Sequence, residues 1–164
     1  MKVAKLKLFV VLLALPVLHC FANQKVEWLD ENRIPGPGDV EVTVMASVPM
    51  PEEEIQYLER TILENAQEVL AGDSGAYKIN VSITEYEEGS AFARCMLIGL
   101  GTMHLTARIE VYEVGKDEPL KRGVLDKDYI VGGFVGFAAT MRKDITSKVG
   151  PDIKEALRES MKTN

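Results

Sequence analysis

The sequence has few of the side chains that most often carry catalysis or bind metals. Its 164 residues include two cysteines and two histidines. A structural zinc site needs four such ligands at short spacing, and a nucleophilic triad needs a histidine base beside a nucleophile and a carboxylate. No pattern of either kind occurs, so we expect no catalytic residue, metal or cofactor.

Positive charge is also scarce, with 19 basic and 25 acidic residues and a net charge of −6. Proteins that bind nucleic acid normally carry a basic patch, so this class of partner is excluded. Adsorption to an anionic membrane through charge alone is disfavoured for the same reason. A surplus of carboxylates instead favours solubility.

A long apolar run occurs only at the start of the chain. Leu8 to Leu18 is unbroken and follows Lys2, Lys5 and Lys7. Eleven apolar residues are too few to span about 30 Å of hydrocarbon. A basic start, a short apolar core and small residues after it indicate a secretory signal peptide over residues 1–22.

Two cleavage sites fit this segment. Cleavage after Ala22 leaves a soluble periplasmic or secreted protein that begins at Asn23. Alternatively, Cys20 is a lipobox cysteine and becomes the acylated end of a membrane-anchored lipoprotein, although His19 is larger than that motif prefers. The remaining chain holds 16 basic and 25 acidic residues, enough length for one domain, and Cys95 without a disulfide partner. Cys95 is interpreted as a small buried hydrophobe or as a reactive thiol.

Residues 23–39 resemble a flexible arm, because the sequence from Arg33 to Gly38 contains prolines and glycines that break helices and strands. Trp28 and Leu29 are isolated apolar residues in this arm that could dock on the domain.

Hydrophobic periodicity then predicts one domain over residues 40–162. Alternation predicts strands over 40–48, 77–84 and 103–111, and a less regular strand over 120–131. A helix of about 20 residues is expected between Pro51 and Gly72, and residues 85–90 form a polar turn. A second helical region, 134–161, is interrupted at Gly150-Pro151 into two pieces or one kinked helix. The order β-α-β-β-β-α predicts an α+β fold, a two-layer sandwich with a mostly antiparallel sheet and helices on one face.

Two segments in the middle of the chain suggest a relationship. Arg94 to Gly101, followed by Leu105 to Tyr112, resembles the bacterial envelope family known as domain of unknown function 4410. The resemblance rests on glycines, apolar residues and topology, and covers about residues 40–160. It implies a small α/β module of lipoproteins or envelope complexes and supplies no activity.

Two groups of side chains allow both a functional and a simpler interpretation. His104 and Cys95 could form a thiol dyad, but a solvated strand histidine is the simpler interpretation. Carboxylates could bind calcium, yet no calcium-loop motif is present; they are Glu85, Glu87, Glu88, Asp126 and Asp128.

Two surfaces could bind a partner. The segment after Gly132-Gly133 is either a tight strand-to-helix connection or an exposed apolar lip for a protein or lipid chain, formed by Phe134, Val135 and Phe137. The polar face of the sheet is either simply solvated or a platform for peptide or glycan, formed by Thr43, Ser47, Asn80, Ser82, Thr84, Thr106 and Arg108.

We therefore expect an exported, non-enzymatic protein of the bacterial cell envelope that binds an envelope protein or a lipid. One alternative is a component of an envelope transport or secretion complex, anchored in the membrane only if Cys20 is acylated. A hydrolase that uses carboxylates or Cys95 is a further alternative.

Overall fold

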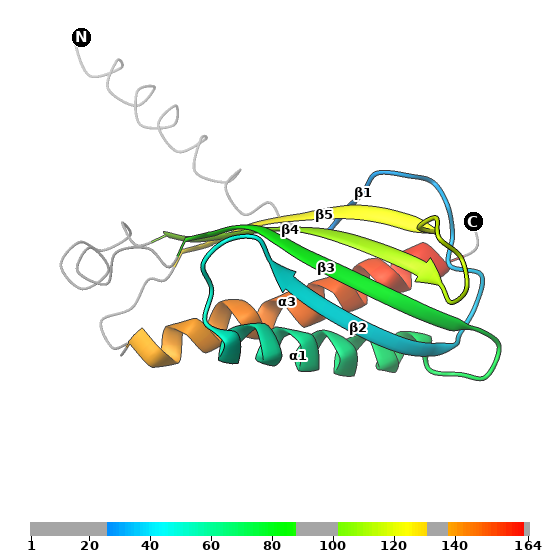
Figure 1. Ribbon diagram of the computed structural model, residues 1–164, viewed down its shortest axis with the longest axis horizontal. Helices are drawn as coiled ribbons and strands as arrows, with labels where there is room; N and C mark the ends of the chain where they lie inside the picture. Colours follow the sequence, from blue (N-terminus) through cyan, green and yellow to red (C-terminus); the bar gives the residue numbers. More distant parts are fainter. Residues whose placement is uncertain (1–25, 88–101, 131–137, 163–164) are drawn as a thin grey trace, which may run out of the picture.

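The structure is a computed structural model that describes residues 26–87, 102–130 and 138–162. A five-stranded sheet lies over two helices (Figure 1), which confirms the expected α+β class and two-layer arrangement. The described elements are β1 (Glu27–Trp28), β2 (Asp39–Ala46), α1 (Glu52–Leu70), β3 (Ala76–Glu87), β4 (Thr102–Glu113), β5 (Lys121–Ile130) and α3 (Ala138–Met161).

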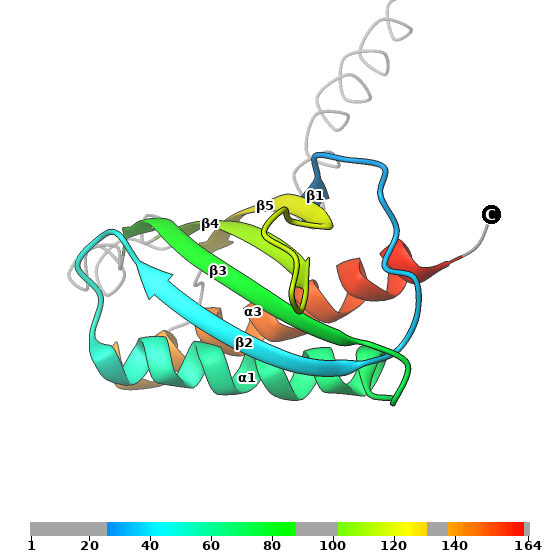
Figure 2. The same ribbon diagram turned by 45° about the vertical axis from the view of Figure 1, so that its right-hand side comes forward.

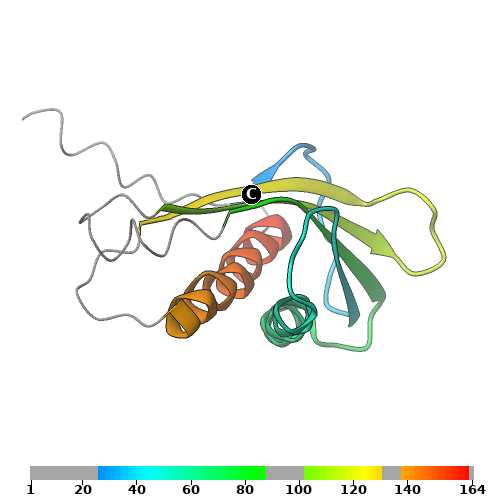
Figure 3. The ribbon, with the colours of Figure 1, turned by 60° about the vertical axis from the view of Figure 1, so that its left-hand side comes forward.

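The strand order in the sheet is β1-β5-β4-β3-β2. β2 and β3 are parallel, whereas the other neighbouring pairs are antiparallel. Parallel neighbours need a crossover connection, and α1 provides it. α1 and α3 lie on the same face of the sheet (Figure 3). We call this the inner face, and the opposite face, which carries neither helix, the outer face.

The core fills the space between the inner face and the helices. From Tyr77 to Ile83 on β3 and from His104 to Val111 on β4, side chains alternate between buried and less buried positions, as period-two patterning predicts. The buried residues of the two helices recur at three- and four-residue steps. The core side chains include Tyr77, Ile79, Val81, Ile83, Leu105, Ala107, Ile109, Val111, Leu58, Ile62, Ala66, Leu70, Val149, Ile153 and Leu157.

α1 begins directly after Pro51 and has three glutamates in its first turn, where the helix dipole favours negative charge. Its 19 residues agree with the expected length. Glu54 is nonetheless buried, and its carboxylate accepts a hydrogen bond of 2.7 Å from the hydroxyl of Tyr86.

α3 continues as one helix through Gly150-Pro151, so of the two expected alternatives the structure has a single helix and not two separate pieces. Gly150 lies against α1: a Cβ atom there would be 2.8 Å from side-chain atoms of Thr61 and Asn65. The glycine therefore permits close packing of the two helices. Pro151 is exposed and leaves that contact undisturbed.

The described part of the predicted arm, residues 26–39, is attached to the domain. β1 pairs with β5, and the indole of Trp28 donates a 3.1 Å hydrogen bond to the carbonyl of Ala156 in α3. The chain then passes round the end of the sandwich to β2 on the other edge (Figure 2). Val26 and Ile34 are buried in the core, whereas Leu29 is exposed.

Lys121, which is almost fully buried on β5, holds this segment in place. Its ammonium donates hydrogen bonds to the carbonyls of Asp30, at 3.2 Å, and Asn32. The same ammonium lies 5.1 Å from the ring centroid of Trp28, within the range of a cation–π interaction. We call these contacts between Lys121 and residues 28–32 the Lys121 latch.

Candidate functional site

A β-bulge in β3 shapes the polar cluster on the outer face. Ile83 pairs with Ala107, but Glu85 pairs with Thr106, so Thr84 is an extra residue. The insertion reverses the alternation: Glu85 turns to the outer face and Tyr86 to the inner face. Residues 85–87 are therefore strand, and the prediction that a turn begins at Glu85 is wrong.

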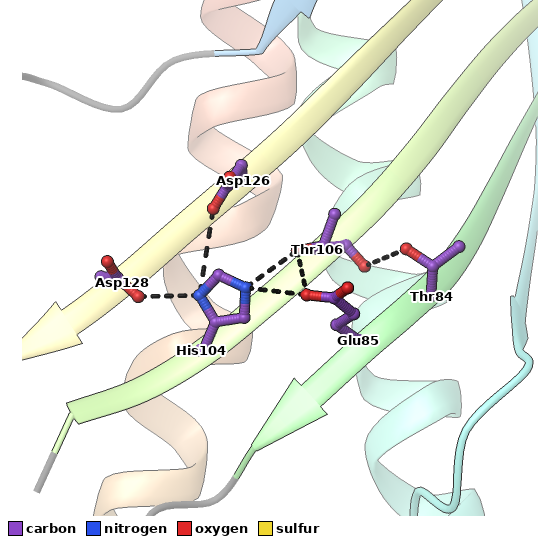
Figure 4. A network of polar contacts seen from close by, with 6 residues as sticks. All are labelled: Thr84, Glu85, His104, Thr106, Asp126 and Asp128. Carbon is purple, nitrogen blue, oxygen red and sulfur yellow. Dashed lines mark hydrogen bonds and ion pairs between the residues drawn. The ribbon is translucent and has the colours of Figure 1, made fainter.

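His104 lies at the centre of this cluster (Figure 4). Its Nδ1 is 2.7 Å from a carboxylate oxygen of Asp128 on β5 and 3.9 Å from one of Asp126. Its Nε2 is 3.2 Å from Glu85 on β3 and 3.0 Å from the hydroxyl of Thr106. One imidazole thus links three neighbouring strands.

The pKa of His104 is raised above 6.5, chiefly by the hydrogen bond to Asp128. Partial burial opposes the rise, while the negative charges of Asp128 and Asp126 and the hydrogen bond to Glu85 add to it. Protonation makes both ring nitrogens donors, which matches carboxylates on both sides. In that form the ring links the carboxylates of Glu85 on β3 and Asp128 on β5.

The cluster contains carboxylates that could bind calcium on sequence grounds, but the imidazole of His104 lies between those of Glu85 and Asp128. Among residues 26–87, 102–130 and 138–162, no group of three or more histidine, cysteine or acidic side chains is placed to hold a metal ion. Glu88 lies outside this part of the chain. The arrangement suits internal ion pairing better than metal coordination.

The outer face has two unlike ends. One end is the acidic cluster, which we define as Glu85, Glu87, Asp126 and Asp128 around His104. Further along the face, cross-strand pairing places Ser82 opposite Arg108 and Asn80 opposite Thr43.

Most of the predicted platform therefore lies on one surface. The exceptions are at its border. Thr84 occupies the bulge, where its hydroxyl donates to the carbonyl of Thr106 at 3.4 Å, and the hydroxyl of Ser47 donates to the carbonyl of Ile83 at 3.0 Å.

Other candidates fall outside the described residues. This holds for the cleavage and lipidation residues Ala22 and Cys20, for Cys95, and for the apolar lip formed by Phe134, Val135 and Phe137. These remain predictions. Within the described ranges, no helix is both long and apolar enough to cross a membrane.

The comparisons with known proteins concern the fold. No family model matches the sequence, and no curated protein does. Among solved structures, the chain is similar to PelC L103M from Paraburkholderia phytofirmans, a dodecamer, with 10% identity, a TM-score of 0.54, and coverage of 84% of this chain and 98% of that one. A second PelC dodecamer from the same organism has 9% identity, a TM-score of 0.52 and coverage of 77% and 95%. The chain thus shares the fold of PelC over nearly the whole length of that protein.

Proposed function

We propose that this protein is exported to the bacterial cell envelope and acts there by binding or assembly, with the outer face of its sheet as the contact surface. One observation carries the proposal: neither described helix covers that face, although its polar side chains are already ordered by cross-strand contacts. A flat, ordered surface suits a protein or glycan partner better than a small substrate, which needs a concave site.

We favour a structural role for His104, as a link between strands, over a catalytic one. Both of its ring nitrogens are engaged with acidic or hydroxyl groups, and its raised pKa favours the protonated form. A general base needs an unprotonated nitrogen near a reacting group. The proposed resemblance to the domain of unknown function 4410 family is consistent with a role as an envelope module.

A second candidate is a lipid-anchored component of an envelope transport or secretion complex. It is favoured by the fold shared with PelC, whose solved structures are dodecamers, and by Cys20 in the signal segment. The intact mass of the protein purified from its host distinguishes the two candidates. A chain that begins at Asn23 supports the unanchored protein, an acylated Cys20 supports the anchored one, and retention of residues 1–22 contradicts export through signal cleavage.

Crosslinking tests the contact surface itself. A photoreactive residue at Ser82, in the middle of the outer face, should capture a specific envelope protein or glycan in intact cells. The matched control is the same residue at Gln67, an exposed position of α1. Equal capture at both positions, or none at Ser82, would contradict the proposed surface.

A further inference from the structure

β2 lies at one edge of the sheet, and half of its backbone groups point away from the other strands. The amide of Ser47 donates a 2.9 Å hydrogen bond to the carbonyl of Ile83 on β3, and the amide of Asp39 donates one of 3.0 Å to Gly75. Backbone groups of successive residues point to opposite sides of a strand, so the even-numbered residues from Val40 to Ala46 point away from β3. No strand among the described residues lies on that side.

A contact with α1 agrees with this direction. The carboxylate of Glu59 accepts a 3.3 Å hydrogen bond from the amide of Val44. A side chain therefore occupies the position that a backbone carbonyl of a further strand would take. The backbone groups of Val40, Val42 and Ala46 point to the same side, and such a row of donors and acceptors is a template for another strand.

The two edges of the sheet differ in how they are protected. Beyond β1, β5 carries the exposed Asp126 and Asp128, and Lys127 on its inner side contacts α3. Charged residues on an edge, and charges that point inwards, discourage association between sheets. β2 has no charged residue from Val42 to Ala46. Its Met45 is instead a large apolar side chain that is 54% exposed.

We propose that a second copy of this chain pairs with this edge, β2 against β2, about a twofold axis at Thr43. Antiparallel pairing about this residue uses all four outward-directed positions of each strand. Val42 then lies opposite Val44 of the second copy, and Val40 lies opposite Ala46. Because the axis is twofold, one surface serves both molecules and the contact closes on itself.

The distribution of charge along β2 favours this occupant. The carboxylates of Asp39 and Glu41 lie in the first half of the strand, and the second half is uncharged. The twofold axis places Glu41 opposite Met45 and Thr43 opposite its own equivalent, so no carboxylate faces another. Threonine pairs of this kind stabilise antiparallel strands, whereas directly opposed like charges destabilise them. Pairing of β2 with β5 of a second copy would bring two acidic edges together.

Disulfide crosslinking tests the position of the axis. The two Thr43 residues form a non-hydrogen-bonded pair with Cα atoms about 4.5 Å apart, a separation that a disulfide can span. In a chain that lacks residues 1–22 and carries Cys95→Ser, Thr43→Cys should therefore form a covalent dimer in a glutathione redox buffer. Met45→Cys in the same background is the matched control and should give about tenfold less dimer, because it faces Glu41. Equal yields, or no dimer from Thr43→Cys, would overturn the proposal.

Charge variants distinguish this pairing from unspecific association. Met45 faces Glu41 twice in the twofold pair, so Met45→Glu should raise the dissociation constant of the dimer about tenfold and Met45→Lys should lower it several-fold. Leu29→Glu and Leu29→Lys make the same changes at an exposed apolar residue beside the opposite edge and should alter it less than about twofold. Sedimentation equilibrium measures the constants. Equal shifts at both positions, or a monomer at every concentration, would overturn the proposal.

A variant of Glu59 tests the edge itself. In the pair, the carbonyl of Val42 of the second copy replaces Glu59 as the acceptor for the amide of Val44. Glu59→Ala should therefore lower the dissociation constant several-fold, and Glu64→Ala, at an exposed position of the same helix, should not. Equal constants for these two variants would contradict pairing at this edge. None of these results depends on a partner at Ser82, so failure here leaves the proposed function untouched.

Discussion

β3 and β5 lie on either side of β4, and they fill the inner face in opposite ways. The inner positions of β3 before the bulge are Tyr77, Ile79, Val81 and Ile83, all buried among core side chains. The inner positions of β5 are Lys121, Gly123, Leu125 and Lys127. Lys121 contacts the N-terminal segment, and Lys127 contacts the carboxylate of Asp152 in α3. β3 fills its inner positions with apolar side chains, whereas β5 places two lysines there that contact groups on other elements.

Substitution of a buried apolar residue on β3 should cause the largest loss of stability. Ile79→Ala deletes methyl and methylene groups from a fully buried site and should lower the free energy of unfolding by about 2–5 kcal/mol. Urea denaturation measures the loss. Val114→Ala, at an exposed apolar residue, is the control and should change stability by less than about 0.5 kcal/mol. A loss at Ile79 no larger than the control would show that β3 is not a core strand.

Contact between β5 and the N-terminal segment comes next. A Cβ atom at Gly123 would lie 2.7 Å from the ring of Trp28, so Gly123→Ala must displace a rigid side chain. We expect the free energy of unfolding to fall by about 1–3 kcal/mol. Displacement of the indole should also shift the fluorescence to the red. The signal reports on Trp28 alone, because it is the single tryptophan of the chain. Gly36→Ala, where an added Cβ meets nothing within 4 Å, is the matched control. Unchanged fluorescence in Gly123→Ala would contradict the packing of Trp28.

Lys127, on the inner face of β5, should make the free energy of unfolding depend on pH. Burial, with a contribution from the nearby Lys148, lowers the pKa of Lys127 from 10.5 to about 8. Between these values the unfolded chain binds more protons at this residue, so the stability should rise from pH 8 towards pH 10 by about 1–3 kcal/mol.

Lys127→Met should remove most of that rise, and Lys116→Met, at an exposed lysine, should keep it. Tyr77 and Tyr112 have pKa values raised above 10.0 and act in the opposite direction, which is why the comparison stops near pH 10. Parallel curves for the two lysine variants would contradict the lowered pKa.

The smallest effect concerns the outer face, where charges stay in contact with solvent. His104 has a raised folded pKa, so its stabilising contribution is complete below the unfolded value of 6.5 and disappears as the pH rises through the folded value. His104→Gln should therefore cost less than about 1 kcal/mol at pH 6 and nothing at pH 9. In a variant that lacks residues 1–22, His104 is the single histidine, so its NMR titration can be followed without assignment. An NMR pKa below 6.5 would contradict the ion pairs.

The same contrast explains which parts of the fold were predictable. β3 and β4 follow the period-two rule, because apolar inner residues alternate with polar outer ones, and α1 begins and ends where Pro51 and Gly72 indicate. β5 had a less regular pattern because two of its inner positions are lysines. β1 has two residues, too few for any periodicity, and its position depends on Trp28, Gly123 and Lys121, which are far apart in sequence.

The candidate site was foreseen only in part. Alternation correctly placed His104, Thr106 and Arg108 on the polar face. Alternation did not predict that Glu85 would join them, because the bulge at Thr84 changes the alternation. The polar residues that follow the bulge also resemble a turn. The polar stretch at the end of β3 contains one aromatic residue, Tyr86. Such a stretch is compatible with both a turn and a continued strand.

The Lys121 latch also determines how the domain responds to mechanical force. The described chain enters at the edge of β5, and its first contacts are a two-residue strand and the side chains of residues 28–32. Tension applied through the N-terminus would peel these contacts one after another before it reached β2, which shares eight paired positions with β3. Residues 28–32 should therefore separate under tension before β2 and β3 do.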